Sequence, residues 1–139
     1  MNSGYLLDTN VISETRKMRA DPGVLSFLSQ ANEAGLFLSV LTLGELRKGV
    51  EAKRRTDETT ADQLRAWVDG IETTFADRVL SIDLAVARRW SELSAGRSLP
   101  VIDTLIAATA MRHELTLVTR NTRDVQSTGV AIVDPWQAR

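Results

Sequence analysis

Acidic side chains follow short apolar runs at widely separated points of this sequence. Asp8 comes directly after Tyr5-Leu6-Leu7, Glu45 lies shortly after the apolar run 36–40, and Asp103 lies near the start of a long apolar stretch. The three acids are 37 and 58 residues apart, about one strand–helix unit or more each. Polar side chains that follow parallel strands meet at one edge of a sheet. We therefore expect these carboxylates to converge.

A convergent group of carboxylates indicates a divalent metal ion. Carboxylates in one cleft repel one another, so that without a cation at least one takes a raised pKa. The sequence has no cysteine and a single histidine, His113, so any metal must be held mainly by oxygen, which favours Mg²⁺ or Mn²⁺. A bound metal activates water and binds a phosphodiester oxygen. The acids thus favour metal-assisted phosphodiester hydrolysis.

Each acid also has a purely structural interpretation. Asp8 could instead be the N-terminal cap of a helix. The residues Thr42 to Glu45 match a capping box, in which Glu45 reaches back to the first amide of the helix; spacing alone favours this role. Asp103 in a first helical turn gains about 0.3–1 kcal/mol from the helix dipole. It opens a strongly apolar helix, however, and this favours a functional role.

A fourth polar segment follows the apolar run 116–118. Thr119 comes first, and Asn121 and Asp124 lie beyond it. Asn121 and Asp124 fit a turn or a capped helix start, so the structural and functional interpretations both stay open. Asp83 is expected to be a plain helix cap, and His113 is expected to end a helix without a catalytic role.

Alternating strands and helices would position these groups. The pattern predicts a parallel sheet of about five strands covered by helices on both faces, an α/β/α sandwich. A chain of 139 residues fits a single domain, 1–139. The expected strands are 5–7, 36–40, 79–82, 116–118 and 130–133, the expected helices are 9–17, 22–35, 42–55, 61–75, 84–93 and 100–113, and a loop is expected at 56–60.

Charge and composition exclude several classes of protein. The net charge is −1. We expect no leader and no membrane span, because the first residues do not pair a charged stretch with an apolar one and no apolar run approaches about 18 residues. The small net charge disfavours a histone-like coating of nucleic acid. The lack of an expected leader or membrane span leads us to expect a cytoplasmic location. Basic residues occur in local patches, most of which are expected to be solvated helix faces. The better candidates for contacts with RNA phosphates are Arg16, Lys17, Arg120 and Arg123.

Four ordered segments resemble the acidic segments of PIN domains. They are Leu6–Ser13, Ser39–Gly49, Ile102–Ala110 and Leu117–Val125. Their order and separation agree with that family over residues 5–136, and the chain is most similar to the VapC/FitB-type toxins of bacterial toxin–antitoxin pairs.

The resemblance implies a Mg²⁺- or Mn²⁺-dependent endoribonuclease with a PIN-like fold that a cognate antitoxin inhibits. It also implies a homodimer, which can join a larger toxin–antitoxin assembly, and an RNA substrate such as tRNA or another structured RNA. The metal-binding acids of the family fall on Asp8, Glu45 and Asp103. Many members carry an acid where this chain has Asn121, and others carry Asn there with an Asp at the place of Asp124. Thr9 and Thr119 would support the site through hydrogen bonds.

One alternative to the enzyme remains: a PIN-like module that binds RNA or protein without cutting. The presence of Asp8, Glu45 and Asp103 favours the enzyme. For its inhibition, we expect an antitoxin arginine to enter the acidic cleft, because the planar guanidinium pairs well with carboxylates. Apolar surface near Ile12 and Val50 is the expected place for the rest of the antitoxin to dock.

Overall fold

A five-stranded parallel sheet forms the centre of the computed structural model, which describes residues 4–136 of the chain. The strand order is β3-β2-β1-β4-β5, and each neighbouring pair is parallel. The predicted α/β/α sandwich is thereby confirmed, although the third and fifth strands are shorter than expected. The strands are β1 (Tyr5–Leu7), β2 (Leu36–Ser39), β3 (Val79–Leu80), β4 (Thr116–Val118) and β5 (Ile132–Val133).

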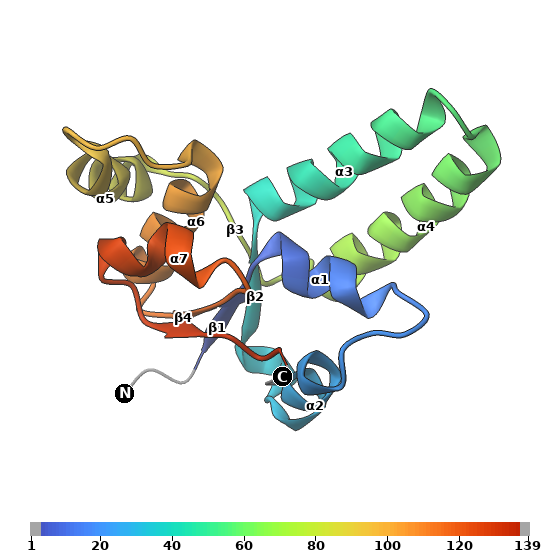
Figure 1. Ribbon diagram of the computed structural model, residues 1–139, viewed down its shortest axis with the longest axis horizontal. Coiled ribbons are helices and arrows are strands. Elements are labelled where there is room, and N and C mark those ends of the chain that lie inside the picture. Colours follow the sequence, from blue (N-terminus) through green and yellow to red (C-terminus); the bar gives the residue numbers. More distant parts are fainter. Residues whose placement is uncertain (1–3, 137–139) are drawn as a thin grey trace.

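Seven α-helices connect and cover these strands within residues 4–136. Figure 1 shows α1, α3 and α4 on one side of the sheet and α5, α6 and α7 on the other. No helix in the described part of the chain is both long enough and apolar enough to cross a bilayer. The helices are α1 (Thr9–Thr15), α2 (Pro22–Gln30), α3 (Val40–Arg54), α4 (Glu58–Thr74), α5 (Leu84–Ser94), α6 (Val101–Arg112) and α7 (Thr122–Val125).

Alternate side chains of the strands enter two separate cores. Leu7 and Val118 are buried in the core that α1, α2, α3 and α4 cover. Leu6 and Leu117 are buried in the opposite core, which α6 and α7 cover. This alternation follows from the two-residue repeat of a strand. It leaves both faces of the central strands covered and directs the polar groups to the strand ends.

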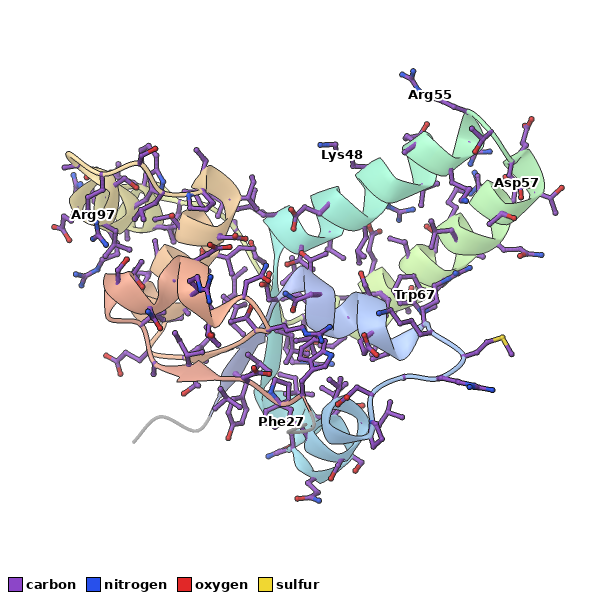
Figure 2. The ribbon with its side chains drawn as sticks, in the orientation of Figure 1. Phe27, Lys48, Arg55, Asp57, Trp67 and Arg97 are labelled. Atoms are coloured by element: carbon purple, nitrogen blue, oxygen red, sulfur yellow. The ribbon has the colours of Figure 1, made fainter. Side chains whose placement is uncertain are left out.

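Two predicted helix limits are wrong. The helix expected over 22–35 ends at Gln30, and a separate 3₁₀ turn occupies Glu33–Gly35. The loop expected at 56–60 ends earlier, because α4 begins at Glu58: the carboxylate of Asp57 accepts a hydrogen bond from the Thr60 amide at 3.1 Å and caps the helix. Asp57 lies at the sharp turn between α3 and α4 (Figure 2).

The predicted start of α3 is also wrong. Ser39, rather than Thr42, caps this helix, and its hydroxyl accepts a hydrogen bond from the Leu41 amide at 3.0 Å. Thr42 is fully buried within the first turn. Because the capping residue lies three positions earlier than expected, Glu45 lies in the second turn, too far along to reach back to it. The capping-box interpretation of Glu45 therefore fails.

The first turn of α6 lies at the surface. Val101 and Ile102 are exposed, whereas the residues 106–110 are buried. The strongly apolar helix that the sequence predicts over 100–113 therefore has an exposed beginning. Asp103 lies at the junction, where the helix enters the core, and its carboxylate stands between solvent and apolar surface.

The ends of β1 and β4 bring two site residues together. The Asp8 amide donates to the Val118 carbonyl at 2.9 Å, and the Thr119 amide donates to the Val133 carbonyl at 3.0 Å. The hydrogen-bond ladder of the sheet thus continues for one residue beyond β1 and β4. The chain builds β2 and β3 on one side of β1 and then β4 and β5 on the other, so the order of strands reverses between β1 and β4. Such reversal points form clefts at the carboxyl edge of parallel sheets.

Candidate active site

A hollow of about 350 Å³ lies at this edge of the sheet. It brings together the three predicted acids, which come from the end of β1, the second turn of α3 and the first turn of α6. Asn121 also lines the hollow, whereas Asp124 does not. We call it the acid cleft. The residues that line it are Asp8, Thr9, Asn10, Ser13, Glu45, Asp103 and Asn121.

Asp8 is both a helix cap and a cleft residue. Its Oδ1 accepts a hydrogen bond from the Thr9 amide at 2.8 Å at the start of α1. Its Oδ2 accepts one from the Thr119 hydroxyl at 2.7 Å. Burial raises the pKa of Asp8, and these two hydrogen bonds oppose the increase. A carboxylate has about four acceptor sites, so capping leaves capacity for a cation. The two interpretations of Asp8 are therefore compatible.

The hydroxyl of Thr119 links three parts of the cleft wall. It donates to Asp8, accepts from the backbone amide of Asn121 at 3.0 Å and accepts from Nδ2 of Asn10 at 3.5 Å. Asn10 also donates to Asp8 Oδ2 at 3.4 Å. Thr119 is buried, so it is well placed to fix the carboxylate of Asp8. Asn10 was not among the predicted site residues, although its position two residues after Asp8 was a signal.

Glu45 is held by a threonine from another helix. The Thr9 hydroxyl lies 2.5 Å from Oε1 of Glu45 and 3.3 Å from the hydroxyl of Thr42. Thr9 begins α1 and Glu45 lies on α3, so this contact joins the two helices at the cleft. The predicted supporting position of Thr9 agrees with this geometry. Glu45 is exposed and lines the acid cleft.

Asp103 has the most strongly shifted pKa in the cleft. Partial burial raises its pKa to about 6, and the negative charges of Asp8, Asp124 and Glu45 add to the increase. The exposed Asp124 on α7 therefore acts on Asp103 through its charge even though it does not line the cleft. The four acids form one electrostatically unfavourable group when no cation is present.

The oxygen atoms of the cleft side chains are suitable ligands for a divalent cation that retains several waters. No three acidic or histidine side chains within residues 4–136 lie close enough to hold one metal ion among themselves. Mg²⁺ is commonly bound by only one or two carboxylates, with waters and substrate phosphates completing its shell. Oδ1 of Asn10 is buried and has no hydrogen-bond partner in the described structure. It is an acceptor without a donor on a side chain that lines the cleft beside Asp8.

The four cations predicted to contact RNA do not line the acid cleft. Arg16 lies 5.8 Å above the Trp67 ring, and Arg120 lies 5.1 Å above the Trp136 ring. Lys17 forms an ion pair with Glu14 at 2.9 Å. Arg123 is exposed on α7. His113, as expected, ends α6 away from the cleft.

The raised pKa of Asp103 predicts a pH-dependent stability. Because the protonated carboxyl is favoured in the fold, its contribution stabilises the metal-free protein at low pH and is lost as the pH rises from about 4 to about 6. Above pH 6, Asp103→Asn should therefore be more stable than the wild type by about 1–2 kcal/mol, or roughly 3–6 °C in Tm. Melting curves in EDTA across pH 4–8 measure this difference. A constant difference between the two proteins at every pH would contradict it.

Residues 5–129 match the sequence profile of the PIN domain family. This match covers most of the chain and includes every residue that lines the acid cleft. The chain therefore belongs to the PIN domain family, in agreement with the resemblance of its four acidic segments.

Individual relatives are similar over nearly their whole length. The VapC ribonuclease Y4jK of Sinorhizobium fredii is 36% identical, over 95% of this chain and 97% of the relative. Toxin FitB of Neisseria gonorrhoeae is 33% identical, over 94% of this chain and 97% of the relative. The FitAcB crystal structure from the same organism superposes with a TM-score of 0.88 at 32% identity, covering 96% of this chain and 99% of that one. A toxin–antitoxin complex from Klebsiella pneumoniae gives a TM-score of 0.67 at 25% identity, covering 97% of this chain and 100% of that one.

Proposed function

We propose that this chain is a toxin endoribonuclease, acting as one PIN domain over residues 1–139, and that the acid cleft is its active site. The observation that carries the proposal is the convergence of Asp8, Glu45 and Asp103 from three separate parts of the chain on one hollow. Holding these charges together is unfavourable unless a cation is bound. A module that only binds RNA or protein has no need of such an arrangement, so the enzyme is favoured. The relatives named as a VapC ribonuclease and a toxin support the same class of activity.

The cofactor that suits this site is Mg²⁺ or Mn²⁺. Asp8, Asp103 and Glu45 would hold the ion, directly or through its waters. When bound, such an ion supplies an activated water and binds a phosphodiester oxygen. Thr119 and Thr9 keep the carboxylates of Asp8 and Glu45 in place. Asn121 would orient the attacking water through its side-chain amide, and Asp124 would add negative charge near Asp103.

The proposed partners are an RNA substrate in the cytoplasm, such as tRNA or another structured RNA, and a cognate antitoxin. The similarity to a toxin–antitoxin complex supports the antitoxin. Antitoxin docking near Ile12 and Val50 stays a proposal: these two side chains are buried in the core beneath α1 and α3, so any docking surface there must come from their neighbours. We propose a homodimer, which can join a larger assembly with the antitoxin. Exposed Leu84 and Val101, at the starts of α5 and α6, offer apolar surface for a second copy.

Incubation of the purified chain with total cellular RNA tests the proposed function. Cleavage is expected with Mg²⁺ or Mn²⁺ and is expected to stop when EDTA removes the metal. Equal cleavage with EDTA would contradict the metal-dependent site. No cleavage with either metal, by protein that melts cooperatively, would favour the non-catalytic alternative.

Thr119→Val is expected to weaken catalysis without unfolding the protein. Valine fills the same space but removes the hydroxyl that donates to Asp8 and accepts from Asn121. Loss of such a supporting contact typically costs about 10- to 100-fold in metal affinity or activity. Thr119→Ser keeps the hydroxyl and is the matched control. Cleavage rates and Mg²⁺ dependence of the two variants provide the test, and equal activity would show that Thr119 has no positioning role.

A further inference from the structure

A second hollow of about 230 Å³ adjoins the acid cleft between α1, α3 and α4. Three residues, Thr9, Ser13 and Glu45, line both hollows, so the two share a wall. We call the second hollow the indole pocket. Its remaining lining residues are Arg16, Leu46, Gly49, Leu64 and Trp67.

The lining of the indole pocket differs from that of the acid cleft. Trp67, which lies on α4 facing the end of α1 (Figure 2), gives it an aromatic wall, and Leu46 and Leu64 give it apolar surface. The guanidinium of Arg16 lies 5.8 Å from the centre of the Trp67 ring and places a positive charge at this wall. Aromatic, apolar and cationic groups thus meet directly beside a cluster of carboxylates.

This combination matches the chemistry of a single nucleotide. Proteins recognise unpaired RNA bases by stacking them on aromatic rings or on arginine guanidinium planes. Arginine also contacts the phosphates on either side of such a base. The carboxylates of the acid cleft cannot provide either contact. The indole pocket can provide both, and it lies where a nucleotide next to the cleaved bond would reach.

The backbone of α3 leaves room for such a base. Gly49 lies in the interior of this helix, where glycine costs roughly 0.5–1 kcal/mol relative to alanine. A Cβ built on Gly49 meets no atom within 4 Å. A larger side chain at this position would therefore enter the pocket without disturbing the packing of the helix.

We propose that the indole pocket binds one unpaired nucleobase of the RNA, next to the phosphodiester bond that the acid cleft cleaves. This inference rests on the proposed ribonuclease function and adds a substrate subsite to it. Trp67 and Arg16 form the stacking wall, and Arg16 also contacts the adjoining phosphate. The enzyme would then require an unstacked base at one fixed distance from the cleavage point, with limited preference for which base it is.

Removal of single bases from the RNA tests the proposal without altering the protein. The probe is a single-stranded RNA oligonucleotide that the wild-type chain cleaves at one mapped bond, made with an abasic site at each position in turn. We expect one abasic position, within two nucleotides of that bond, to lower kcat/KM roughly 10- to 100-fold. Trp67→Ala should lower kcat/KM on the intact RNA by a similar factor and should be insensitive to that abasic site. If no abasic position affects cleavage, the proposal is overturned.

Filling the pocket provides a second test that keeps Trp67. Gly49→Leu is expected to lower kcat/KM by at least about 10-fold, whereas the matched control Gly70→Leu on α4, which also has open space and lines neither hollow, should cleave normally. Tryptophan fluorescence separates binding from turnover. Titration with the same RNA should quench emission in the wild type and in Trp90→Phe but not in Trp67→Phe.

The outcomes distinguish this proposal from the ribonuclease itself. If the wild type cleaves no RNA, the proposed function is wrong, and the nucleobase subsite that rests on it is wrong too. If the wild type cleaves RNA and Gly49→Leu and Trp67→Ala cleave equally well, only the nucleobase subsite is overturned. If these variants cleave normally but no longer bind the antitoxin, the indole pocket belongs to the protein partner, which also overturns the proposal.

Discussion

Replacing Asp103 or Asp8 by asparagine is expected to abolish RNA cleavage while leaving the fold intact. Each change removes one negative charge from the acid cleft and keeps the size of the side chain. Supporting contacts of metal ligands are worth about 10- to 100-fold, so the loss of a proposed ligand should exceed about 100-fold. Because the pKa of Asp103 is raised by burial and neighbouring acids, Asp103→Asn should also melt at a higher temperature than the metal-free wild type above pH 6.

A matched control is available on α5. Asp83 caps this helix by accepting a hydrogen bond from the Val86 amide at 2.9 Å and does not line the cleft. Asparagine caps helices about as well as aspartate, so Asp83→Asn should cleave RNA at the wild-type rate. Addition of Mg²⁺ should raise the Tm of the wild type and of Asp83→Asn but not that of Asp8→Asn. Near-normal cleavage by Asp8→Asn or Asp103→Asn would contradict the assignment of the active site.

Glu45→Gln is expected to lower activity strongly and to change stability little. Glutamine keeps an oxygen that can accept the hydrogen bond from Thr9, so the contact between α1 and α3 is retained. It removes the negative charge that would help to hold the cation. We expect at least about a 10-fold fall in kcat/KM, with a partial recovery at high Mg²⁺ concentration. Thermal melts and cleavage assays over a Mg²⁺ series measure the two effects separately.

Thr9→Val provides the comparison for Glu45. It leaves the charge of Glu45 in place but removes the hydroxyl that holds it. A smaller loss of activity than in Glu45→Gln is expected, because the carboxylate can still approach the metal. If Glu45→Gln retained full activity and lost stability instead, Glu45 would be a purely structural link between the helices.

Asp8 and Asp103 could be predicted from the sequence because local patterns indicate where strands end and where buried helices begin. Asp8 follows an apolar run that becomes β1, and Asp103 lies in the first turn of the strongly apolar helix α6. The convergence of the two followed from a general property of parallel sheets, and the structure places both in one cleft. The overall fold was predictable for the same reason.

The local environment of Glu45 was not predictable from its neighbours in sequence. The spacing of Thr42 and Glu45 matched a capping box, but the helix begins at Val40 because Ser39, buried at the end of β2, already caps it. The hydrogen bond of Glu45 to Thr9 depends on how α1 packs against α3. The pairing of Arg16 with Trp67 likewise arises only when α1 and α4 lie together. Such contacts between distant residues leave no periodic signal in the sequence.

Cleavage of a circularised tRNA or other structured RNA tests the central claim most directly, because a circle has no ends for an exonuclease to use. With Mg²⁺, the wild-type chain should convert the circle to linear RNA, and EDTA or Asp8→Asn should prevent this conversion. Because water rather than the neighbouring 2′-hydroxyl is the proposed nucleophile, the products should carry no 2′,3′-cyclic phosphate. A circle that stays intact with Mg²⁺ and Mn²⁺, or that is opened equally well in EDTA, would contradict the account.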